Sequence, residues 1–177
     1  MKRLLTLLFF ILLIARAYAQ NLVPVDAGSS VKFVIKNFGF STPGSFSGLK
    51  GTIRFDDANM ANASFNVSIN AATINTENET RDRHLLKEEY FDSEKYPLIS
   101  FTSTSISVTR PGNYLINGRL TIKNITKEIS FPFTATAQNN GYLFSGSFKI
   151  NRRDFTVGSS SMVLADNLEV TLSVLAK

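Results

Sequence analysis

The feature that most constrains the fold of this chain is an alternation of apolar and polar residues with a period of two. In one segment, Tyr114, Ile116 and Leu120 alternate with polar residues such as Asn117 and Arg119. Successive side chains of a β-strand point to opposite faces, so this pattern predicts strands with one apolar and one solvated face. The same alternation recurs at residues 31–36, 65–70, 129–135, 142–150 and 168–174.

Two further strands are predicted at Ser45–Phe55 and Leu98–Val108. In the first, the apolar phase changes, so a bulge or bend is expected near Gly48 or Gly51. The total is about eight strands. Short turn sequences such as Pro111-Gly112-Asn113 require the strands that they join to be antiparallel. The pattern therefore predicts an all-β fold and leaves a closed barrel and a two-sheet sandwich both open.

The segment around residues 76–92 is charged and has no period of two. Thr76 and Glu79 have the spacing of a helix capping box, and Leu86 and Tyr90 lie four residues apart. We predict a short helix here. It is too polar to form a core of its own, so we expect it to cap a barrel mouth.

The first nineteen residues have the layout of a secretory signal. A basic start, Met1–Arg3, precedes an apolar run at residues 4–15 and then the small-residue site Ala17-Tyr18-Ala19. The run is shorter than the roughly 20 residues that a membrane span needs. We therefore predict a signal peptide at residues 1–19 and one domain at residues 20–177. The mature protein is expected to be periplasmic or secreted, with no stable membrane insertion.

Composition excludes several functions. The chain has no cysteine and one histidine, so it offers no disulfide, no thiolate metal site, no cysteine nucleophile and no multi-histidine metal centre. The full chain carries a net charge of +5, but signal cleavage removes three basic residues and no acid. The remaining 16 basic and 14 acidic residues give +2, which argues against nucleic acid as a partner.

Phenylalanine is abundant: 13 of the 15 in the chain lie beyond the signal, and most of those in strands fall on the apolar phase. In an eight-stranded barrel such rings can fill the interior or line a ligand cavity. Periodicity alone does not separate a packed core from a hollow one.

Several motifs occur in an order that resembles the YceI family of bacterial periplasmic and secreted proteins, also called polyisoprenoid-binding proteins. The resemblance covers essentially residues 22–177. Its most specific pieces are Gly44-x-Phe46-Ser47-Gly48, Arg81-Asp82-x-His84-Leu85, Tyr96-Pro97-x-Ile99-Ser100-Phe101, Gly118-x-Leu120-Thr121-Ile122-Lys123 and Arg153-Asp154-Phe155.

The resemblance implies an extended, lipocalin-like antiparallel barrel whose interior is an apolar tunnel for an isoprenoid chain, such as that of an isoprenoid quinone or a polyprenyl phosphate. The ligand would be stored or carried without chemistry, and no other cofactor is implied. Another small amphiphile, such as a fatty acid or an amide, is the alternative. Dimers occur in the family, so a homodimer is possible. The aromatic residues expected to line the tunnel are Phe33, Phe46, Phe55, Phe65, Phe101, Phe131, Phe133, Tyr142, Phe144, Phe148 and Phe155.

Four polar residues are candidates for the ligand's head group: Arg81, Asp82, His84 and Arg153. Asp82 and His84 would also be the acid–base pair of a hydrolase or isomerase. That reading is disfavoured because residues two apart on a helix do not face each other. A metal at His84 and Glu88 is disfavoured because one histidine with solvated carboxylates ligates zinc poorly.

Overall fold

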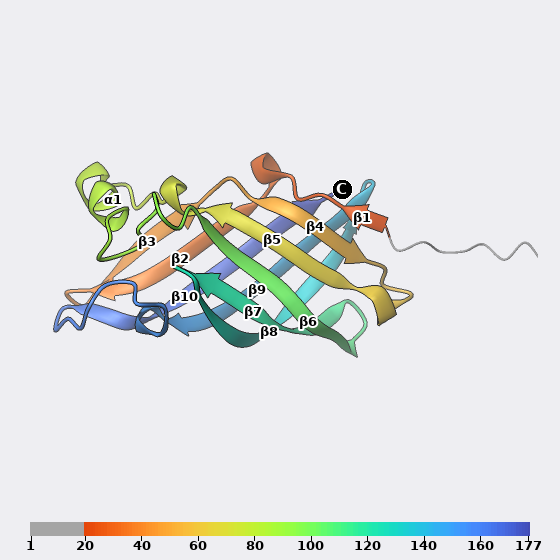
Figure 1. Cartoon of the computed structure of the whole chain (residues 1–177). Coiled ribbons are helices and arrows are strands. Elements are labelled where there is room, and N and C mark those ends of the chain that lie inside the picture. The colour runs from red at the N-terminus through yellow and green to blue at the C-terminus, as the bar shows by residue number, and fades with distance from the viewer. Residues whose placement is uncertain (1–19) are drawn as a thin grey trace, which may run out of the picture.

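The computed structural model describes residues 20–177, and the predicted signal segment lies outside the described residues. Ten strands form one strongly curled sheet (Figure 1). They are β1 (Gln20–Leu22), β2 (Ser30–Asn37), β3 (Phe40–Phe46), β4 (Lys50–Phe55), β5 (Ser64–Asn70), β6 (Leu98–Arg110), β7 (Asn113–Ile122), β8 (Ile125–Gln138), β9 (Gly141–Asn151) and β10 (Leu164–Ala176).

The sheet is antiparallel throughout, in the order β1-β4-β5-β6-β7-β8-β9-β10-β2-β3. Strands β4 to β10 lie in chain order, and the two-residue turns that join β6, β7, β8 and β9 require those neighbours to be antiparallel. The β2–β3 hairpin lies against the C-terminal strand β10, and β1 lies against β4. This order confirms the predicted all-β, lipocalin-like fold.

The two edge strands, β1 and β3, do not pair with each other. The chain after β1 instead reaches β10, where Val23 and Lys177 exchange backbone hydrogen bonds of 2.7 and 3.1 Å. At the other edge, Ser45 of β3 exchanges two bonds of 2.9 Å with Asn75. These contacts tie the chain after β1 to the C-terminal end of β10, and one position of edge strand β3 to the segment before α1.

The prediction of eight strands was too low for two reasons. The predicted strand Ser45–Phe55 is divided between β3 and β4 at Gly48, which has a φ of +76°. Most of β3 escaped prediction because it contains Pro43 and Gly44, residues that are depleted in strands. Proline is tolerated there because β3 is an edge strand. The second reason is β1, whose three residues are too few to show a period.

The predicted helical cap is present but short. Helix α1 (Glu79–Leu85) lies at one end of the sheet (Figure 1). Its N-cap is Asn78, whose side-chain oxygen accepts from the backbone N–H of Arg81, so the predicted capping box at Thr76 was wrong. Within residues 20–177 no helix has the length and apolar character to cross a bilayer. The remaining helical turns are η1 (Asp26–Gly28), η2 (Met60–Asn62), η3 (Ala71–Thr73) and η4 (Arg152–Phe155).

One end of the interior is densely packed with aromatic rings. The Phe55 side chain is 1% exposed and makes edge-to-face contacts with Tyr142 and Phe144, at ring-centroid distances of 4.9 and 5.0 Å. Tyr114 stacks on Phe133 at 5.1 Å. Such aromatic pairs stabilise a core beyond the area that they bury. This cluster, together with Leu22 and Ala176, closes the end of the sheet where the two termini of the domain meet.

Candidate functional site: an apolar cavity with a polar mouth

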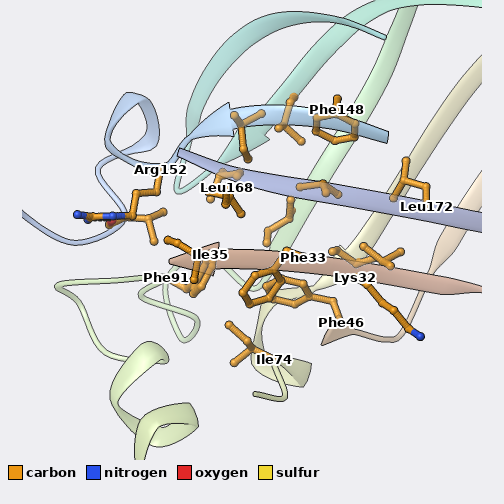
Figure 2. A pocket seen from close by; sticks show the side chains of 18 of the residues that line it. Lys32, Phe33, Ile35, Phe46, Ile74, Phe91, Phe148, Arg152, Leu168 and Leu172 are labelled. Atoms are coloured by element: carbon orange, nitrogen blue, oxygen red, sulfur yellow. Dashed lines mark hydrogen bonds between the residues drawn. The ribbon is translucent and has the colours of Figure 1, made fainter. Parts of the chain in front are cut away.

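Beyond the aromatic cluster the interior holds a second buried group, which includes Leu49, Ile69 and Phe155, and an open space beside it. A cavity of about 570 Å³ lies inside the curled sheet, within the size range of small-molecule sites. Figure 2 shows Phe33, Phe46 and Phe91 gathered on one side, where neighbouring ring centroids are 5.6–5.7 Å apart. Leu168 and Leu172 of β10 extend the wall. The lining is therefore overwhelmingly apolar.

The cavity runs lengthwise along the strands. Lining residues on β10 extend from Leu164 to Val174, ten residue steps, or about 33 Å of extended strand. At its inner end the lining includes Phe65, Phe133 and Phe144, which also belong to the packed aromatic cluster. The cluster is thus the floor of the cavity.

A glycine sets the width of the cavity beside Phe33. Gly44 lies opposite Phe33 in the β2–β3 ladder, and the Phe33 ring lies directly over it. A Cβ atom at position 44 would be 2.2 Å from the Phe33 ring. Any larger residue would therefore displace this ring, which itself lines the cavity.

Most of the aromatic residues expected to line the interior do so. The eight on the cavity wall are Phe33, Phe46, Phe65, Phe101, Phe131, Phe133, Phe144 and Phe148. Phe55, Tyr142 and Phe155 do not line the cavity, which corrects their predicted placement. Phe55 and Tyr142 pack into the aromatic cluster, and Phe155 is 1% exposed among other core residues at η4.

The site residues predicted from the sequence for the cavity wall are all aromatic, whereas much of the wall is formed by aliphatic side chains that were not predicted. Strand β10 forms much of the aliphatic wall, and the alternation of its apolar residues is visible in the sequence. The lining residues that were not predicted as site residues include Val31, Ile35, Leu168, Val170, Leu172, Val174, Tyr90 and Phe91.

Exposed lining residues mark the mouth. They are concentrated in the segment between η4 and β10, residues 156–163, which we call the mouth loop, and in α1 beside it. Ser159, Ser160 and Ser161 of the loop and His84 of α1 are all both exposed and part of the lining. Polar groups therefore surround the entrance of an apolar cavity.

Arg81 is held at this mouth by Thr76. Its Nε donates to the Thr76 hydroxyl oxygen at 2.7 Å and its Nη2 to the Thr76 carbonyl at 2.6 Å. The Thr76 hydroxyl in turn donates to Asp82, which also accepts from the Thr76 backbone N–H at 3.0 Å. Arg81 lines the cavity, whereas Asp82 does not. The position of Asp82 is therefore structural: it fixes the residue that orients Arg81.

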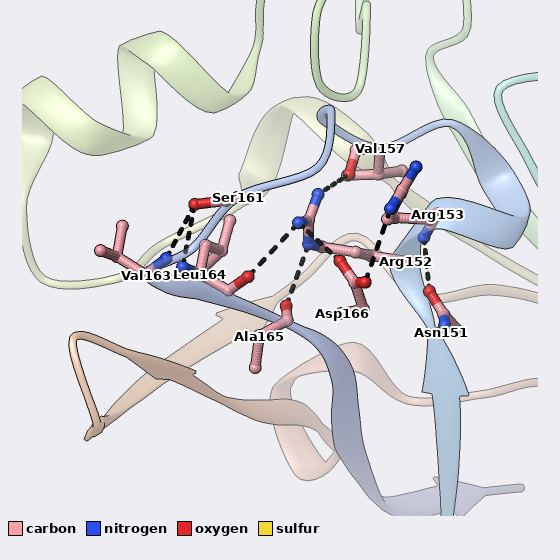
Figure 3. Close-up of polar contacts among 9 residues, drawn as sticks. All are labelled: Asn151, Arg152, Arg153, Val157, Ser161, Val163, Leu164, Ala165 and Asp166. Atoms are coloured by element: carbon pink, nitrogen blue, oxygen red, sulfur yellow. Dashed lines mark hydrogen bonds and ion pairs between the residues drawn. The ribbon is translucent and has the colours of Figure 1, made fainter.

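The second arginine predicted to contact a ligand was Arg153, but the arginine on the cavity wall is its neighbour, Arg152. Arg152 is 5% exposed. Figure 3 shows its guanidinium surrounded by carbonyls of the mouth loop and of β10. It donates to Val157 at 2.8 Å, Ala165 at 3.0 Å and Leu164 at 3.4 Å, and to the Asp166 carboxylate at 2.9 Å.

Arg153 lies outside the cavity. It is half-exposed and reaches Asp166 with an N···O distance of 3.7 Å (Figure 3). The strand β9 ends at Asn151, and the chain then turns into η4, so the strand alternation no longer tells which arginine points inward. Arg152 escaped prediction for that reason.

Asp82 and His84, the two residues considered for acid–base chemistry, contact different partners. Asp82 is bonded to Thr76, and the His84 ring packs edge-on against Tyr90 with ring centroids 5.0 Å apart. Within residues 20–177, no three His, Cys, Asp or Glu side chains gather in a group that could hold a metal ion. The arrangement suits binding of an apolar tail with a polar end.

A curled antiparallel sheet around an apolar cavity defines a barrel of the lipocalin-like class. Within that class the chain belongs to the YceI-like domain family, whose family model matches residues 23–176. It is 32% identical over 151 residues to a UPF0312 protein of Yersinia enterocolitica, covering 81% of this chain and 78% of that one. Relatives in Yersinia pestis and Yersinia pseudotuberculosis match to the same extent.

Solved structures show the same fold. BcnA of Burkholderia cenocepacia superposes with a TM-score of 0.82 at 25% identity, covering 87% of this chain and 99% of that one. The YCEI protein of Campylobacter jejuni gives 0.69 at 29% identity, covering 76% and 83%. A polyisoprenoid binding domain from Saccharophagus degradans gives 0.71 at 14% identity, covering 90% and 99%, which is a likeness of fold.

Proposed function

We propose that this protein binds the tail of an isoprenoid lipid, such as an isoprenoid quinone or a polyprenyl phosphate, and stores or carries it through water. The observation that carries the proposal is the elongated cavity, about 570 Å³ in volume and lined almost wholly by apolar side chains. Moving a tail from water to such a wall is favourable by roughly 25 cal/mol per Å² of apolar surface buried. Since the cavity is already formed, little ordering cost opposes binding.

The polar mouth supports an amphiphile rather than a plain hydrocarbon. Arg81 is fixed through two of its nitrogens on Thr76, with the exposed serines of the mouth loop nearby on the same lining. Arg152 already donates four hydrogen bonds within the protein, so it is less suited to a ligand. We assign the head-group role to Arg81, with His84 beside it, and withdraw Arg153 from it.

The family membership and the Saccharophagus domain, whose fold this chain shares and which is described as polyisoprenoid binding, support the same proposal. No reaction is required by it. We also propose that the N-terminal signal exports the protein, because a carrier of membrane lipids acts in the aqueous space next to a membrane. We further propose that the ligand passes in and out without covalent change.

Native mass spectrometry of the mature protein, purified without detergent from its producing cells, tests the proposal. A one-to-one adduct with the mass of a quinone or polyprenyl species is the expected result. Protein that arrives empty would be incubated with defined isoprenoids and, separately, with fatty acids and fatty amides. Uptake of fatty acids or amides but not of isoprenoids would show that the ligand is another amphiphile. If the protein takes up none of these lipids, the proposal is wrong.

A His84→Ala variant separates a binding protein from a hydrolase or isomerase. The ring packs on Tyr90 at the mouth and makes no contact with Asp82 that would activate it. We expect the variant to take up isoprenoid as the parent does and to return it unchanged. Conversion of the bound lipid by the parent, lost in the variant, would show that the protein is an enzyme.

A further inference from the structure

Large apolar side chains are exposed beside the mouth of the cavity, in two segments that contact each other. The β2–β3 hairpin carries Phe38, 69% exposed, in its turn and Phe40, 77% exposed, at the start of β3. The mouth loop carries Met162, fully exposed, and Val163, 40% exposed. We call these four residues the rim. The Phe38 backbone N–H donates to the Val163 carbonyl at 2.8 Å, so the two segments form one surface.

Folding does not explain the presence of phenylalanine at position 38. Phe38 and Gly39 both have positive φ, +50° and +80°, as in a two-residue hairpin turn that favours Asn-Gly. A bulky residue in the left-handed region is unfavourable, and the exposed Phe38 ring gains little packing in return. The side chain is therefore better explained by contact with something outside the molecule.

The rim adjoins the cavity itself. Asn37 and Val163 line the cavity, and each is the chain neighbour of a protruding rim residue, Phe38 and Met162. Figure 1 shows the β2–β3 turn and the segment before β10 at the same end of the sheet as α1. The rim therefore lies at the mouth of the cavity.

The charged residues of the hairpin that carries Phe38 and Phe40 are all basic, which suits an anionic surface. Residues 29–55 and 155–165, which contain the two rim segments, include no aspartate or glutamate. Lys36 lies on the hairpin, with its Nζ 2.9 Å from the Ser41 hydroxyl, next to Phe40. Protruding rings with a neighbouring lysine are the combination by which proteins enter the interfacial region of a bilayer.

We propose that the rim docks on the surface of a lipid bilayer containing anionic head groups, and that lipid enters or leaves the cavity there. The inference rests on the proposed function, because it gives the cavity a route to its ligand. The docking is peripheral: the two rings and the methionine enter the interface while the sheet stays in water.

Co-sedimentation with vesicles tests the docking. The probes are vesicles of phosphatidylcholine and of phosphatidylcholine mixed with phosphatidylglycerol. We expect the parent to sediment with the mixed vesicles, and a Phe38→Asn, Phe40→Ser, Met162→Ser variant to lose binding by about tenfold or more, since each buried apolar side chain contributes. Asparagine suits the left-handed turn position, so the variant should fold.

A Val23→Ser, Val108→Ser variant is the matched control. Both valines are exposed, at 58% and 54%. Val23 directly follows β1 and Val108 is two residues before the end of β6, and Figure 1 shows these ends of β1 and β6 at the opposite end of the sheet from α1. This variant should sediment as the parent does. If the parent stays in the supernatant with both kinds of vesicle, the membrane proposal is wrong and a protein partner becomes the occupant to seek.

Binding of the soluble isoprenoid farnesol, measured in the absence of vesicles, separates the two proposals. The rim variant should bind farnesol as the parent does. A parent that binds farnesol but not vesicles overturns the docking and keeps the proposed function. If the parent binds vesicles but neither farnesol nor longer isoprenoids, the docking proposal stands and the proposal of an isoprenoid ligand is wrong.

Discussion

Arg152 ties the mouth loop to the barrel through four hydrogen bonds, one of them to Asp166. Hydrogen bonds from a charged donor stabilise more than neutral ones, and the carbonyls left behind by its removal would be only partly solvated. We expect Arg152→Met to lower the free energy of unfolding by about 2–4 kcal/mol. Urea unfolding followed by circular dichroism measures it.

Arg153→Met is the matched control for that substitution. Arg153 is half-exposed and its one ion pair, with Asp166, is 3.7 Å long. Exposed pairs of this kind contribute little, so we expect a loss below about 1 kcal/mol. Equal losses in the two variants would show that the network around Arg152 does not hold the loop.

The phenols of buried Tyr114 and partly buried Tyr142 predict how stability depends on pH. Burial raises the pKa of Tyr114 and of Tyr142, and the nearby Asp57 carboxylate adds to both shifts. The native state therefore favours the neutral phenols. Their contribution is fully present below about pH 10, the ordinary value for tyrosine, and is lost as the pH rises through the higher pKa of the folded state.

A Tyr114→Phe, Tyr142→Phe variant cannot titrate at these positions in either state. We expect the difference in unfolding free energy between variant and parent to be constant from pH 8 to about 10 and then to shift in favour of the variant. Urea unfolding across that range measures the difference. Parallel curves up to pH 11 would contradict the assignment.

At the residue scale, the sequence predicted which side chains point inward within strands and failed where strands end. Phe33, Phe101 and Phe148 line the cavity as their alternation indicates. Arg153 was chosen over Arg152 because a helical turn begins at that point and ends the period of two. Asp82 is among the predicted head-group candidates, but its hydrogen bonds go to Thr76, a partner that spacing does not reveal.

At the scale of elements, the cap depends on an anchor outside its helix. The seven residues of α1 are too few for an isolated helix, so tertiary contacts must hold it. Thr76, 3% exposed, supplies them: it bonds both Arg81 and Asp82 from a position before the helix.

We expect Thr76→Val to loosen the cap without unfolding the sheet. The substitution removes the hydroxyl that joins Arg81 to Asp82, so the amides of α1 should exchange with deuterium faster and bound isoprenoid should be released sooner. Hydrogen exchange and ligand-release kinetics measure the two effects. Thr80→Val on the same helix is the control, because Thr80 is exposed and accepts only a 3.3 Å bond from Arg83.

The sequence predicted strong elements well and weak ones poorly. Strand β7 shows the predicted phase along its length, with Tyr114, Ile116 and Leu120 buried. Strand β3 was missed because its proline and glycine oppose local strand preference, and only pairing with β2 at the sheet edge makes them acceptable. Such pairing is a tertiary effect that local pattern does not contain.

At the scale of the whole molecule, the interior combines two arrangements that the sequence presented as alternatives. One end is packed with rings around Phe55, and from there toward the mouth lies a cavity lined by strands that include β2, β9 and β10. Both ends are built from strands with the same alternation. The difference arises from how far facing walls stand apart, which depends on the curl of the sheet and so could not be predicted from periodicity.

The two ends should therefore respond in opposite ways to added volume. Leu22 is fully buried in the packed end, so Leu22→Phe should cost about 1–3 kcal/mol of stability and leave isoprenoid binding intact. Val170 faces the cavity, so Val170→Phe should change stability by less than about 1 kcal/mol, since the ring enters empty space. It should instead weaken isoprenoid binding by about tenfold or more, because the ring occupies volume that the tail needs. Urea unfolding and ligand titration of both variants measure the contrast, and a Val170→Phe protein as destabilised as Leu22→Phe would mean that the interior is packed throughout.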